Sequence, residues 1–485
     1  MDYLHLSISE LHNLILKGEV TPEQLVKSAL EKAKKDPNNA FEYICEKEAL
    51  EQLAALTNKD KNSPLYGIPF VLKDNYSTKD IPTCASSNIL EGYIPVFDAE
   101  IVTRLLNAGA ILIGKTTMDE LAMGGSGMSG HLGYTYNPFD PSHKHQMGGS
   151  SCGSAAAMAA GIVPFAIGSD TGDSVRKPAS FGAMVGFKPT WGRISRFGLF
   201  PFAPSMDHVA YFTRDVKDSA ILLSILAGRD DKDSTSSTKP VDIYENKIVS
   251  SLINKKLVVI KEIYDSIPEG KIRTTFDKLV KDLSNKGATI STVSMDINLC
   301  KAIYPTYVVI SCSEATSNNA NLDGIKFGKR KSGESFEEVM TNARTHGFSE
   351  LIKRRFIIGS YSLLKENQHD VFLRAQKCRR LIVNAVNKIL KDADAIMLPA
   401  APTTAPLFNG ASADKLSDEY LIADNFMAIG NFGGLPSITI PMGFENNLPF
   451  GLNITSKAFD EVNLFSVSSA IEETTGIKCV VAKGE

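Results

Sequence analysis

Residues 147–190 read MGGSSCGSAAAMAAGIVPFAIGSDTGDSVRKPASFGAMVGFKPT, and the fold can be predicted outward from this stretch. Glycine, serine and alanine are denser here than core building requires, and small residues let a backbone approach another group closely. Residues 154–161 indicate an alanine-rich helix, residues 163–168 a buried strand and residues 169–174 a second Gly/Ser turn. Because consecutive strand and helix units pack side by side, we expect the two serine-bearing turns to meet on one edge of a sheet.

Short apolar runs alternate with helical patterns on both sides of this stretch. The strand candidates are GIPFVL (67–72), AILIG (110–114), KLVVI (256–260), AIMLP (395–399), SITIP (437–441) and GLNIT (451–455). Helical patterns lie near residues 99–109, 270–286 and 370–391. Alternation of this kind is typical of crossover connections and predicts an α/β fold with a mainly parallel sheet.

The N-terminal segment and one internal stretch differ in character from this pattern. The first 60 residues indicate helices, and Thr21, Pro22 and Gln24 form a helix start with a capping box. The polar, turn-rich stretch 228–242 is the best candidate for a surface loop. We therefore expect a helical segment over residues 1–60, packed on a domain of residues 61–485.

The composition argues against several classes of function. A net charge of −3 gives no global reason to bind nucleic acid. The seven cysteines are scattered without CxxC spacing, which argues against disulfides and zinc and favours a reducing cytoplasm. No acidic or cysteine partners follow His143 and His145 at ligand spacing, so no metal is expected. We expect no signal peptide, since the N-terminus has an early acid and no basic start followed by an apolar run. We expect no membrane span, since no apolar stretch reaches 18 residues.

A lysine follows the first strand candidate. Lys73 ends the run VLK, so it could reach the edge where the serine turns meet. A serine nucleophile needs a base, and a buried lysine can serve if its pKa falls from about 10.4 towards 7–8. That shift costs about 4 kcal/mol, so only a closed and hydrogen-bonded pocket would sustain it.

These segments together resemble a known family. GGSSCGSAAAMAAG, GSDTGDSVRKPASFGAMVGFKPT and GIPFVLKDN resemble the amidase signature family. The chain also resembles one branch of this family, the A subunits of bacterial glutamyl-tRNA(Gln) amidotransferases. Four further segments carry this resemblance: GKTTMDELAMGGSG (114–127), PTYVVISCSEATSNNANLDG (305–324), KRRFIIGS (353–360) and NFGGLPSITIP (431–441). The resemblance covers essentially the whole chain. It implies the amidase signature fold, an α/β architecture whose large mixed, mainly parallel sheet is covered by helices on both faces.

The resemblance implies a Ser-Ser-Lys triad. Ser174 falls on the family's nucleophile, Ser150 on its bridging serine and Lys73 on its base. A cis peptide is implied between Gly149 and Ser150. The oxyanion hole is implied to be the backbone turn of Thr171, Gly172, Asp173 and Ser174.

The resemblance also implies a substrate, glutamine, and a set of partners. Arg355 matches the residue that binds the α-carboxylate, Asp424 the partner of the α-ammonium, and Tyr307 a tyrosine of the same pocket. Ammonia would pass to a B subunit, which uses ATP and Mg²⁺ to convert Glu-tRNA(Gln) to Gln-tRNA(Gln). A small C subunit would complete a cytoplasmic heterotrimer, and this chain itself would hold no cofactor.

Two positions depart from the family pattern. Its GGSSGGS reads here as GGSSCGS, with Cys152, and its TGGS reads as TGDS, with Asp173. Asp173 removes a glycine from the oxyanion turn and adds a carboxylate near developing negative charge. We expect activity to be retained, with the Asp173 side chain turned away and bonded to Arg176 or Lys177. We interpret Cys152 as a small packed residue.

Three alternatives stay open at this point. The chain could be a stand-alone amidase with the same mechanism, or a scaffold subunit that lost activity through Asp173. It could also belong to another hydrolase class, because residues 149–153 formally match the nucleophile elbow GxSxG. Ser151 would then be the nucleophile, served by His208, His346 or His369.

Overall fold

The computed structural model describes residues 2–410 and 417–483. These residues form one eleven-stranded sheet in the order β1-β3-β2-β4-β6-β5-β10-β11-β9-β7-β8. The strands are β1 (Phe41–Ile44), β2 (Pro69–Lys73), β3 (Ile111–Thr116), β4 (Phe165–Asp170), β5 (Val185–Lys188), β6 (His208–Thr213), β7 (Lys256–Ile260), β8 (Thr289–Val293), β9 (Ala395–Pro399), β10 (Ser437–Glu445) and β11 (Leu448–Thr455).

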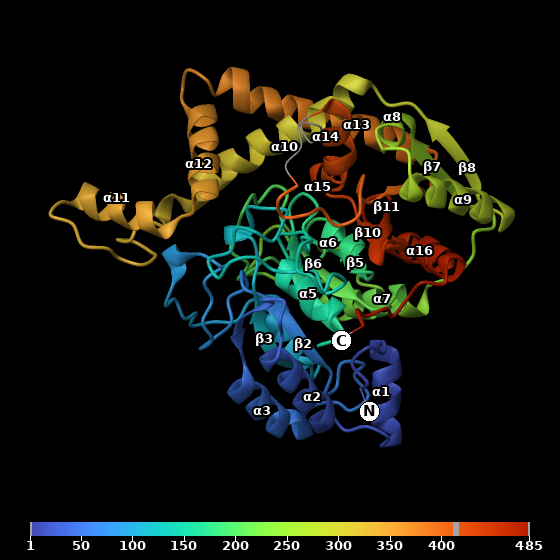
Figure 1. Cartoon of the computed structure of the whole chain (residues 1–485), viewed down its shortest axis with the longest axis horizontal. Helices are drawn as coiled ribbons and strands as arrows, with labels where there is room; N and C mark the ends of the chain where they lie inside the picture. Colours follow the sequence, from blue (N-terminus) through green and yellow to red (C-terminus); the bar gives the residue numbers. More distant parts are fainter. Residues whose placement is uncertain (1, 411–416, 484–485) are drawn as a thin grey trace.

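Helices surround the sheet (Figure 1). The α-helices are α1 (Ile8–Lys17), α2 (Pro22–Lys34), α3 (Glu46–Ala54), α4 (Glu100–Asn107), α5 (Cys152–Ala159), α6 (Arg176–Phe181), α7 (Val216–Leu226), α8 (Lys261–Asp265), α9 (Lys271–Asn285), α10 (Ile297–Asn318), α11 (Phe336–Gly347), α12 (Glu350–Leu363), α13 (Arg374–Lys391), α14 (Asp418–Asn425), α15 (Ala428–Phe432) and α16 (Glu461–Thr475). No helix in the described ranges has both the length and the apolar character needed to cross a membrane.

Alternation along the central strands places helices on opposite faces. Gly168 of β4 faces Ser151 at the start of α5, where an added Cβ would meet the serine side chain. Tyr211 of β6 points the other way and donates its hydroxyl to the carbonyl of Ser219 in α7 over 2.7 Å. Successive side chains of a strand point to opposite faces, so α5 and α7 cover different sides of the sheet. The predicted mixed α/β fold, with helices on both faces, is confirmed.

The sheet contains fewer parallel pairs than the sequence indicates. Among the described strands, four neighbouring pairs are parallel and six are antiparallel. Residues 437–441 and 451–455, both expected as strands, belong to β10 and β11 and form one antiparallel hairpin. Asn446 and Asn447 form the two-residue turn of this hairpin. Their φ angles of 50° and 67° are positive, as a type I′ hairpin turn requires at both central residues.

The N-terminal segment is not purely helical. Helix α2 begins with the predicted capping box, since Thr21 accepts from the N–H of Gln24 and Gln24 reaches back to Thr21. Residues 41–44, however, form β1, which pairs antiparallel with β3. This edge strand is short and only half-buried, so it lacks the apolar run that marks the interior strands. The boundary near residue 60 stays a prediction.

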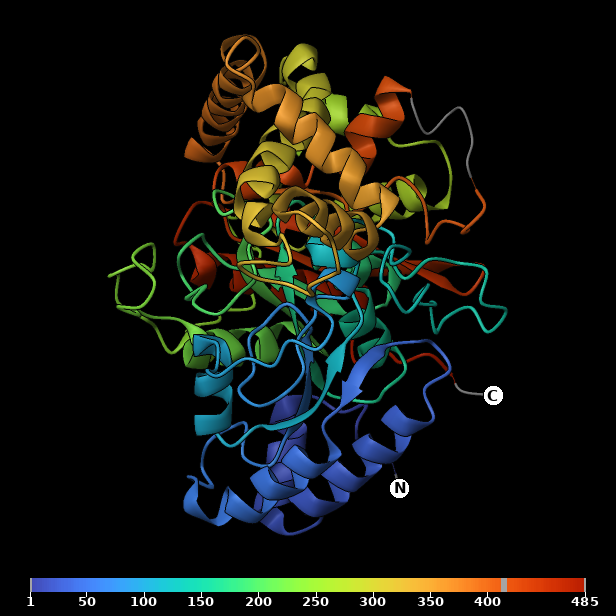
Figure 2. The same ribbon diagram turned by 90° about the vertical axis from the view of Figure 1, so that its left-hand side faces the viewer.

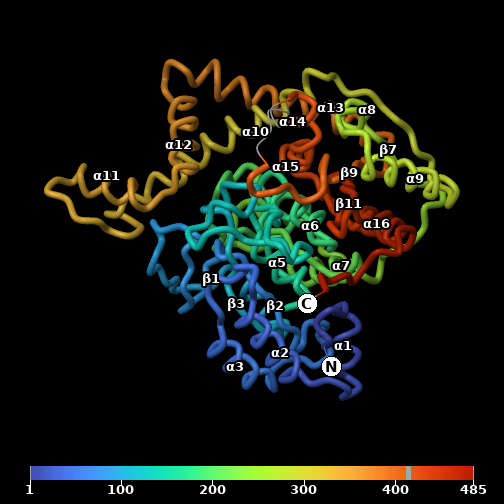
Figure 3. Tube along the Cα trace, viewed as in Figure 1, coloured from blue at the N-terminus to red at the C-terminus, as the bar shows by residue number. Residues whose placement is uncertain are grey.

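A layer of long helices lies over the end of the sheet that carries the site. Helix α10 packs against α12, α13 and α14. Helix α11 and the segments beside it project sideways from this layer in Figure 1 and point towards the viewer in Figure 2. The tube in Figure 3 shows the same projection beyond the body of the molecule. This layer brings residues from the second half of the chain over the turns at the end of β4.

Candidate active site

Both serine-bearing turns lie beside the end of β4. Residues 148–151 lead into α5, and residues 171–174 follow β4 and lead towards α6. The N–H of Ser151 donates to the carbonyl of Ser174 over 3.2 Å and ties the two turns together. Strand β2 runs parallel to β4 and ends at Lys73, so the lysine reaches the same edge.

Lys73 is fully buried among serine hydroxyls. Its Nζ lies 2.7 Å from Ser150 Oγ and 3.0 Å from the Oγ atoms of Ser151 and Ser169. Burial lowers the pKa of Lys73 to about 7, because the charged form loses its hydration. A neutral amine, as a base requires, is therefore accessible near neutral pH. Apart from its place in the second turn, nothing in the sequence indicates Ser169 as a partner of this lysine.

An aspartate holds the backbone around Ser150. The Gly149–Ser150 peptide is cis, as the resemblance implies. The N–H of Asp119 donates to the Ser150 carbonyl over 3.1 Å. The Asp119 carboxylate accepts the N–H groups of residues 126–129 at 3.0, 3.1 or 3.2 Å. The sequence does not predict the role of Asp119, because nothing in its segment indicates that one carboxylate accepts four backbone N–H groups.

Ser174 lies in the second turn with an uncommitted hydroxyl. Its side chain is buried, and among the described residues its hydroxyl forms no hydrogen bond, with Ser150 or with any other group. The backbone N–H groups of Gly172, Asp173 and Ser174 likewise donate to no described acceptor. Free amides of this kind can stabilise an oxyanion. The proton transfer from Ser174 to Ser150 stays a prediction.

A buried ion pair fixes the shape of this turn. Arg176 donates to both carboxylate oxygens of Asp170, at 3.1 and 2.9 Å, and to the carbonyl of Gly172 at 2.7 Å. Burial favours the neutral form of Asp170, but Arg176 outweighs it and holds the pKa of this carboxyl far below its usual value. The Thr171 hydroxyl donates to Asp207 over 2.6 Å at the start of the turn.

The structure brings the three residues of the predicted glutamine pocket into one cavity. Tyr307 of α10, Arg355 of α12 and Asp424 of α14 line a space of about 300 Å³ that reaches Asp173. Arg355 Nε is buried and has no hydrogen-bond partner among the described residues, so it is available to an anion. The Tyr307 ring rests on Gly172, where an added Cβ would lie 2.9 Å from the ring.

A lysine pairs with Asp173, the unusual aspartate of the predicted oxyanion turn. Lys177 Nζ lies 2.7 Å from Asp173 Oδ2 and 3.1 Å from Asp424 Oδ1. Of the two partners that the sequence offers for Asp173, the structure selects Lys177, because Arg176 is committed to Asp170. Burial raises the pKa of Asp173, and the ion pair with Lys177 offsets part of that rise.

Comparison with known proteins agrees with this geometry. The sequence model of the family described as Amidase matches residues 24–465. The chain belongs to the amidase family. Its relatives in that family include the A subunit of the glutamyl-tRNA(Gln) amidotransferase of Pediococcus pentosaceus, 40% identical over 483 residues and covering 98% of each chain.

Solved amidase structures share the fold over almost their whole length. The A subunit of the glutamyl-tRNA(Gln) amidotransferase from Thermotoga maritima has a TM-score of 0.81 and 34% identity, covering 100% of this chain and 99% of its own. The native peptide amidase from Stenotrophomonas maltophilia has a TM-score of 0.80 and 25% identity, covering 97% of each chain.

A nucleophile elbow at Ser151 does not fit this amidase fold. The elbow requires a strand directly before the serine, whereas residues 141–147 form turns and isolated bridges. His208 bonds a backbone carbonyl inside the core, His346 bonds a carbonyl of its own helix and His369 pairs with its neighbouring aspartate. None of the three histidines bonds Ser151.

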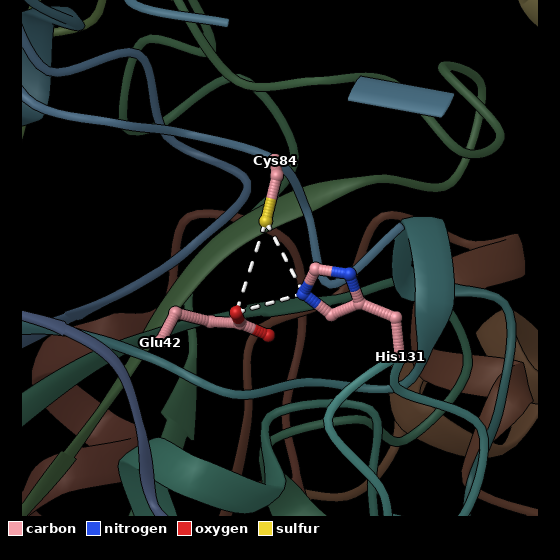
Figure 4. Close-up of side chains that lie close together, drawn as sticks. All are labelled: Glu42, Cys84 and His131. Carbon is pink, nitrogen blue, oxygen red and sulfur yellow. Dashed lines mark hydrogen bonds and ion pairs between the residues drawn. The ribbon is translucent and has the colours of Figure 1, made fainter. Parts of the chain in front are cut away.

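The amidase fold also gathers Glu42, Cys84 and His131, whose side chains could bind a metal (Figure 4). His131 Nε2 lies 2.9 Å from a Glu42 oxygen and 3.6 Å from Cys84 Sγ. The bond to Glu42 raises the pKa of His131, and burial raises the pKa of the Cys84 thiol. The imidazole and the thiol both contact the Glu42 carboxylate directly, which accounts for the cluster without a metal, so we assign none. The Cys84 N–H also bonds Asp74, next to Lys73, which braces the loop after β2.

Proposed function

We propose that this chain is the glutamine-hydrolysing subunit of a glutamyl-tRNA(Gln) amidotransferase and that Ser174 is its nucleophile. The observation that carries the proposal is the buried Lys73, bonded to Ser150 beside the turn of Ser174. The cavity next to this turn offers Arg355 and Asp424 to an amino acid. Relatives of 40% and 34% identity, each named as the A subunit of this amidotransferase, support the assignment.

The proposed reaction begins with neutral Lys73. Lys73 takes a proton from Ser150, and Ser150 takes one from Ser174 as its Oγ attacks the side-chain amide carbon of glutamine. The C–O bond forms, and the N–H groups of residues 172–174 stabilise the oxyanion. The C–N bond then breaks, and the leaving nitrogen departs as ammonia with the proton returned through Ser150. Water hydrolyses the acyl ester on Ser174 and releases glutamate.

Glutamine carries a charge of each sign at its α-carbon, and the cavity offers a group for each. Arg355 suits the carboxylate because its planar guanidinium can form two parallel hydrogen bonds. Asp424 suits the ammonium, and Tyr307 lines the space beside them. A chain that performs this task needs no cofactor of its own.

The ammonia would serve a partner in the cytoplasm. We infer a heterotrimer in which the B subunit uses ATP and Mg²⁺ to amidate Glu-tRNA(Gln), and in which a small C subunit completes the complex. The net charge of −3 suits a chain that leaves tRNA binding to its partners.

The choice of nitrogen donor tests this proposal. In the assembled complex, Gln-tRNA(Gln) formation is measured with glutamine and, separately, with ammonium chloride. We expect Ser174→Ala and Lys73→Met to lose glutamine-dependent amidation by about a thousandfold or more. Both should keep amidation by ammonium, which bypasses the amidase site.

Ser154→Ala is the matched control, because Ser154 is a buried serine of α5 that bonds the Ile167 carbonyl and not Lys73. Glutamine-dependent amidation that survives Ser174→Ala would refute the nucleophile. A parent complex that amidates Glu-tRNA(Gln) with neither donor would refute the function.

A stand-alone amidase is the second candidate, favoured by the match to a peptide amidase. The isolated chain would then hydrolyse peptide amides or simple amides without partners. Under our proposal these are poor substrates, because an amide without an α-carboxylate leaves the buried Nε of Arg355 unpaired. Rates of the isolated chain and of the complex on glutamine and on a peptide amide separate the two functions.

A further inference from the structure

The cavity beside Ser174 contains two cations and two anions. Lys177 contacts both carboxylates, at 2.7 Å to Asp173 and 3.1 Å to Asp424. Arg355, by contrast, pairs with no carboxylate in the part of the chain that the structure describes. We call the three ion-paired residues Asp173, Lys177 and Asp424 the charge bridge. It uses one cation for both acids and leaves the other cation free for a ligand.

The charge bridge joins the oxyanion turn to the helix that holds the ammonium partner. Lys177 stands in α6, four residues after Asp173, and its N–H bonds the Asp173 carbonyl over 2.9 Å. Asp424 stands in α14, which comes from a distant part of the sequence. The Lys177 side chain is 8% exposed and that of Asp173 16%, so solvent screens the pair only weakly.

The position of Asp173 makes its charge costly for the reaction. Negative charge develops at the N–H groups of residues 172–174, and the Asp173 carboxylate belongs to the same turn. An unpaired carboxylate there would repel the oxyanion in a poorly screened site. Lys177 cancels that charge. It binds only the Oδ1 atom of Asp424, so Oδ2 stays available to an ammonium group.

We propose that Lys177 is a positioning residue of glutamine hydrolysis, which neutralises Asp173 beside the nucleophile and holds Asp424 where the substrate ammonium binds. This inference rests on the proposed function. It explains how an aspartate can occupy the oxyanion turn of an active enzyme. The aspartate and the lysine form a matched pair, and neither is expected to work well without the other.

The surrounding groups cannot replace Lys177. Asp170 and Arg176 already neutralise each other. Burial raises the pKa of Tyr307 and raises that of Tyr420 to about 12, so both phenols are neutral. Tyr304 and Arg355 also line the cavity, and Arg355 is left for the substrate carboxylate. Asp173 and Asp424 together raise the pKa of Lys177 despite its burial, so it stays a cation throughout the working range.

A double-mutant cycle in the assembled complex tests the inference. The variants are Lys177→Met, Asp173→Gly and the two combined, assayed for kcat and KM of glutamine hydrolysis. Lys177→Met should lower kcat about tenfold or more, because Asp173 becomes an unpaired anion beside the oxyanion. The double variant should recover most of kcat, since the offending carboxylate is gone. Its KM for glutamine should stay raised, because Asp424 is no longer held.

The pH profile adds a readout that a merely structural role would not move. Activity of the parent should rise to a plateau as Lys73 loses its proton. The loss of kcat in Lys177→Met should be smallest at low pH, where the unpaired Asp173 carboxylate takes up a proton, and Asp173→Gly should abolish this pH dependence. Lys27→Met is the control, because Lys27 forms an exposed i,i+4 pair with Glu23 on α2, a helix that contributes no residue to the lining of the cavity.

Three results would overturn the inference. Unchanged kcat in Lys177→Met would show that its charge is irrelevant. An equal loss in the presence and absence of Asp173 would show that Lys177 does not act through that residue. A loss of kcat in Lys177→Met that is as large at low pH as at high pH would show the same. Amidation with ammonium reports assembly of each variant, and a parent complex without glutaminase activity would refute the proposed function instead.

Discussion

Lys73 decides the chemistry at the scale of single residues. No carboxylate bonds its Nζ among the described residues, and its partners are neutral serine oxygens. An opposite charge in contact would hold the proton on the amine, whereas hydroxyls let burial lower the pKa to about 7. The proposed relay depends on this absence of a counter-ion as much as on the lysine itself.

The rate of glutamine hydrolysis should therefore follow the deprotonation of Lys73. Below pH 7 the protonated fraction grows, so kcat/KM should fall about tenfold per pH unit, and above it the rate should level off. Lys73→Arg should be inactive at every pH, because a guanidinium does not deprotonate in proteins. Initial rates of the complex between about pH 5.5 and 9 measure this. A rate independent of pH across 7 would contradict the assignment of Lys73 as base.

At the scale of elements, α6 and the turn before it form one unit. Arg176, the first residue of α6, bonds Asp170 at the end of β4 and the Gly172 carbonyl in the turn. It also bonds the Met427 carbonyl and Asn431 from the C-terminal part of the sequence. The guanidinium thus connects the oxyanion turn to β4 and to a segment far away in the chain.

Removal of Arg176 should damage the fold as well as the reaction. Arg176→Met leaves the buried Asp170 carboxylate unpaired, so the free energy of unfolding should fall by about 3–5 kcal/mol. Arg273→Met, which breaks a pair with the exposed Glu269, should cost less than about 1 kcal/mol. Chemical denaturation at neutral pH measures both variants. An equal loss of unfolding free energy in the two variants would show that the buried pair stabilises the fold no more than the exposed pair.

Interior elements can be predicted from the sequence, and edge elements cannot. Strands β7 and β9 are short apolar runs bounded by polar residues, and the structure places them at the expected residues, 256–260 and 395–399. Strand β8 (Thr289–Val293) is mostly exposed and has no apolar run that would mark it. The hairpin of β10 and β11 escapes prediction because Asn446-Asn447 lacks the glycine that usually marks such a turn.

The residues of the candidate site also fall into those that the sequence predicts and those that it does not. Lys73 and the serine turns can be found because they carry a recognisable local pattern. Asp119 and Ser169 act through contacts between segments that are separated in the chain, which no local pattern encodes. Sequence spacing alone leaves two candidate partners for the Asp173 carboxylate, Arg176 and Lys177. Only the fold, which commits Arg176 to Asp170, decides between them.

At the scale of the whole molecule, buried acids join the two ends of the chain. Asp218 of α7 accepts the N–H of Ile8 at the start of α1 over 2.7 Å. Glu472 of α16 accepts the N–H of Val216 over 3.0 Å. Burial, with the neighbouring Asp215, raises the pKa of Glu472 to about 8. The first and last segments that the structure describes lie on the same side of the molecule (Figures 1 and 2).

This raised pKa makes the stability depend on pH. A carboxyl whose pKa is about 8 when folded and about 4.3 when unfolded binds more protons in the folded state. Its stabilisation is complete below about pH 4.3 and is lost as the pH rises to about 8, at about 1.4 kcal/mol per unit. Glu472→Gln should therefore gain stability relative to the parent between about pH 5 and 8.

Denaturation of both proteins at several pH values checks this, with exposed Glu366→Gln as the control, since Glu366 is not among the groups that raise the pKa of Glu472. A constant difference between the parent and Glu472→Gln across that range would show that Glu472 is already ionised when folded.

The proposed mechanism requires a covalent intermediate on Ser174. To detect it, the assembled complex is treated with an electrophilic glutamine analogue, and the adduct is located by mass spectrometry of peptides. We predict one adduct on Ser174, blocked by excess glutamine and absent from Lys73→Met. An adduct on Ser151 or Cys152, or an adduct on Ser174 that forms equally well without Lys73, would contradict the mechanism.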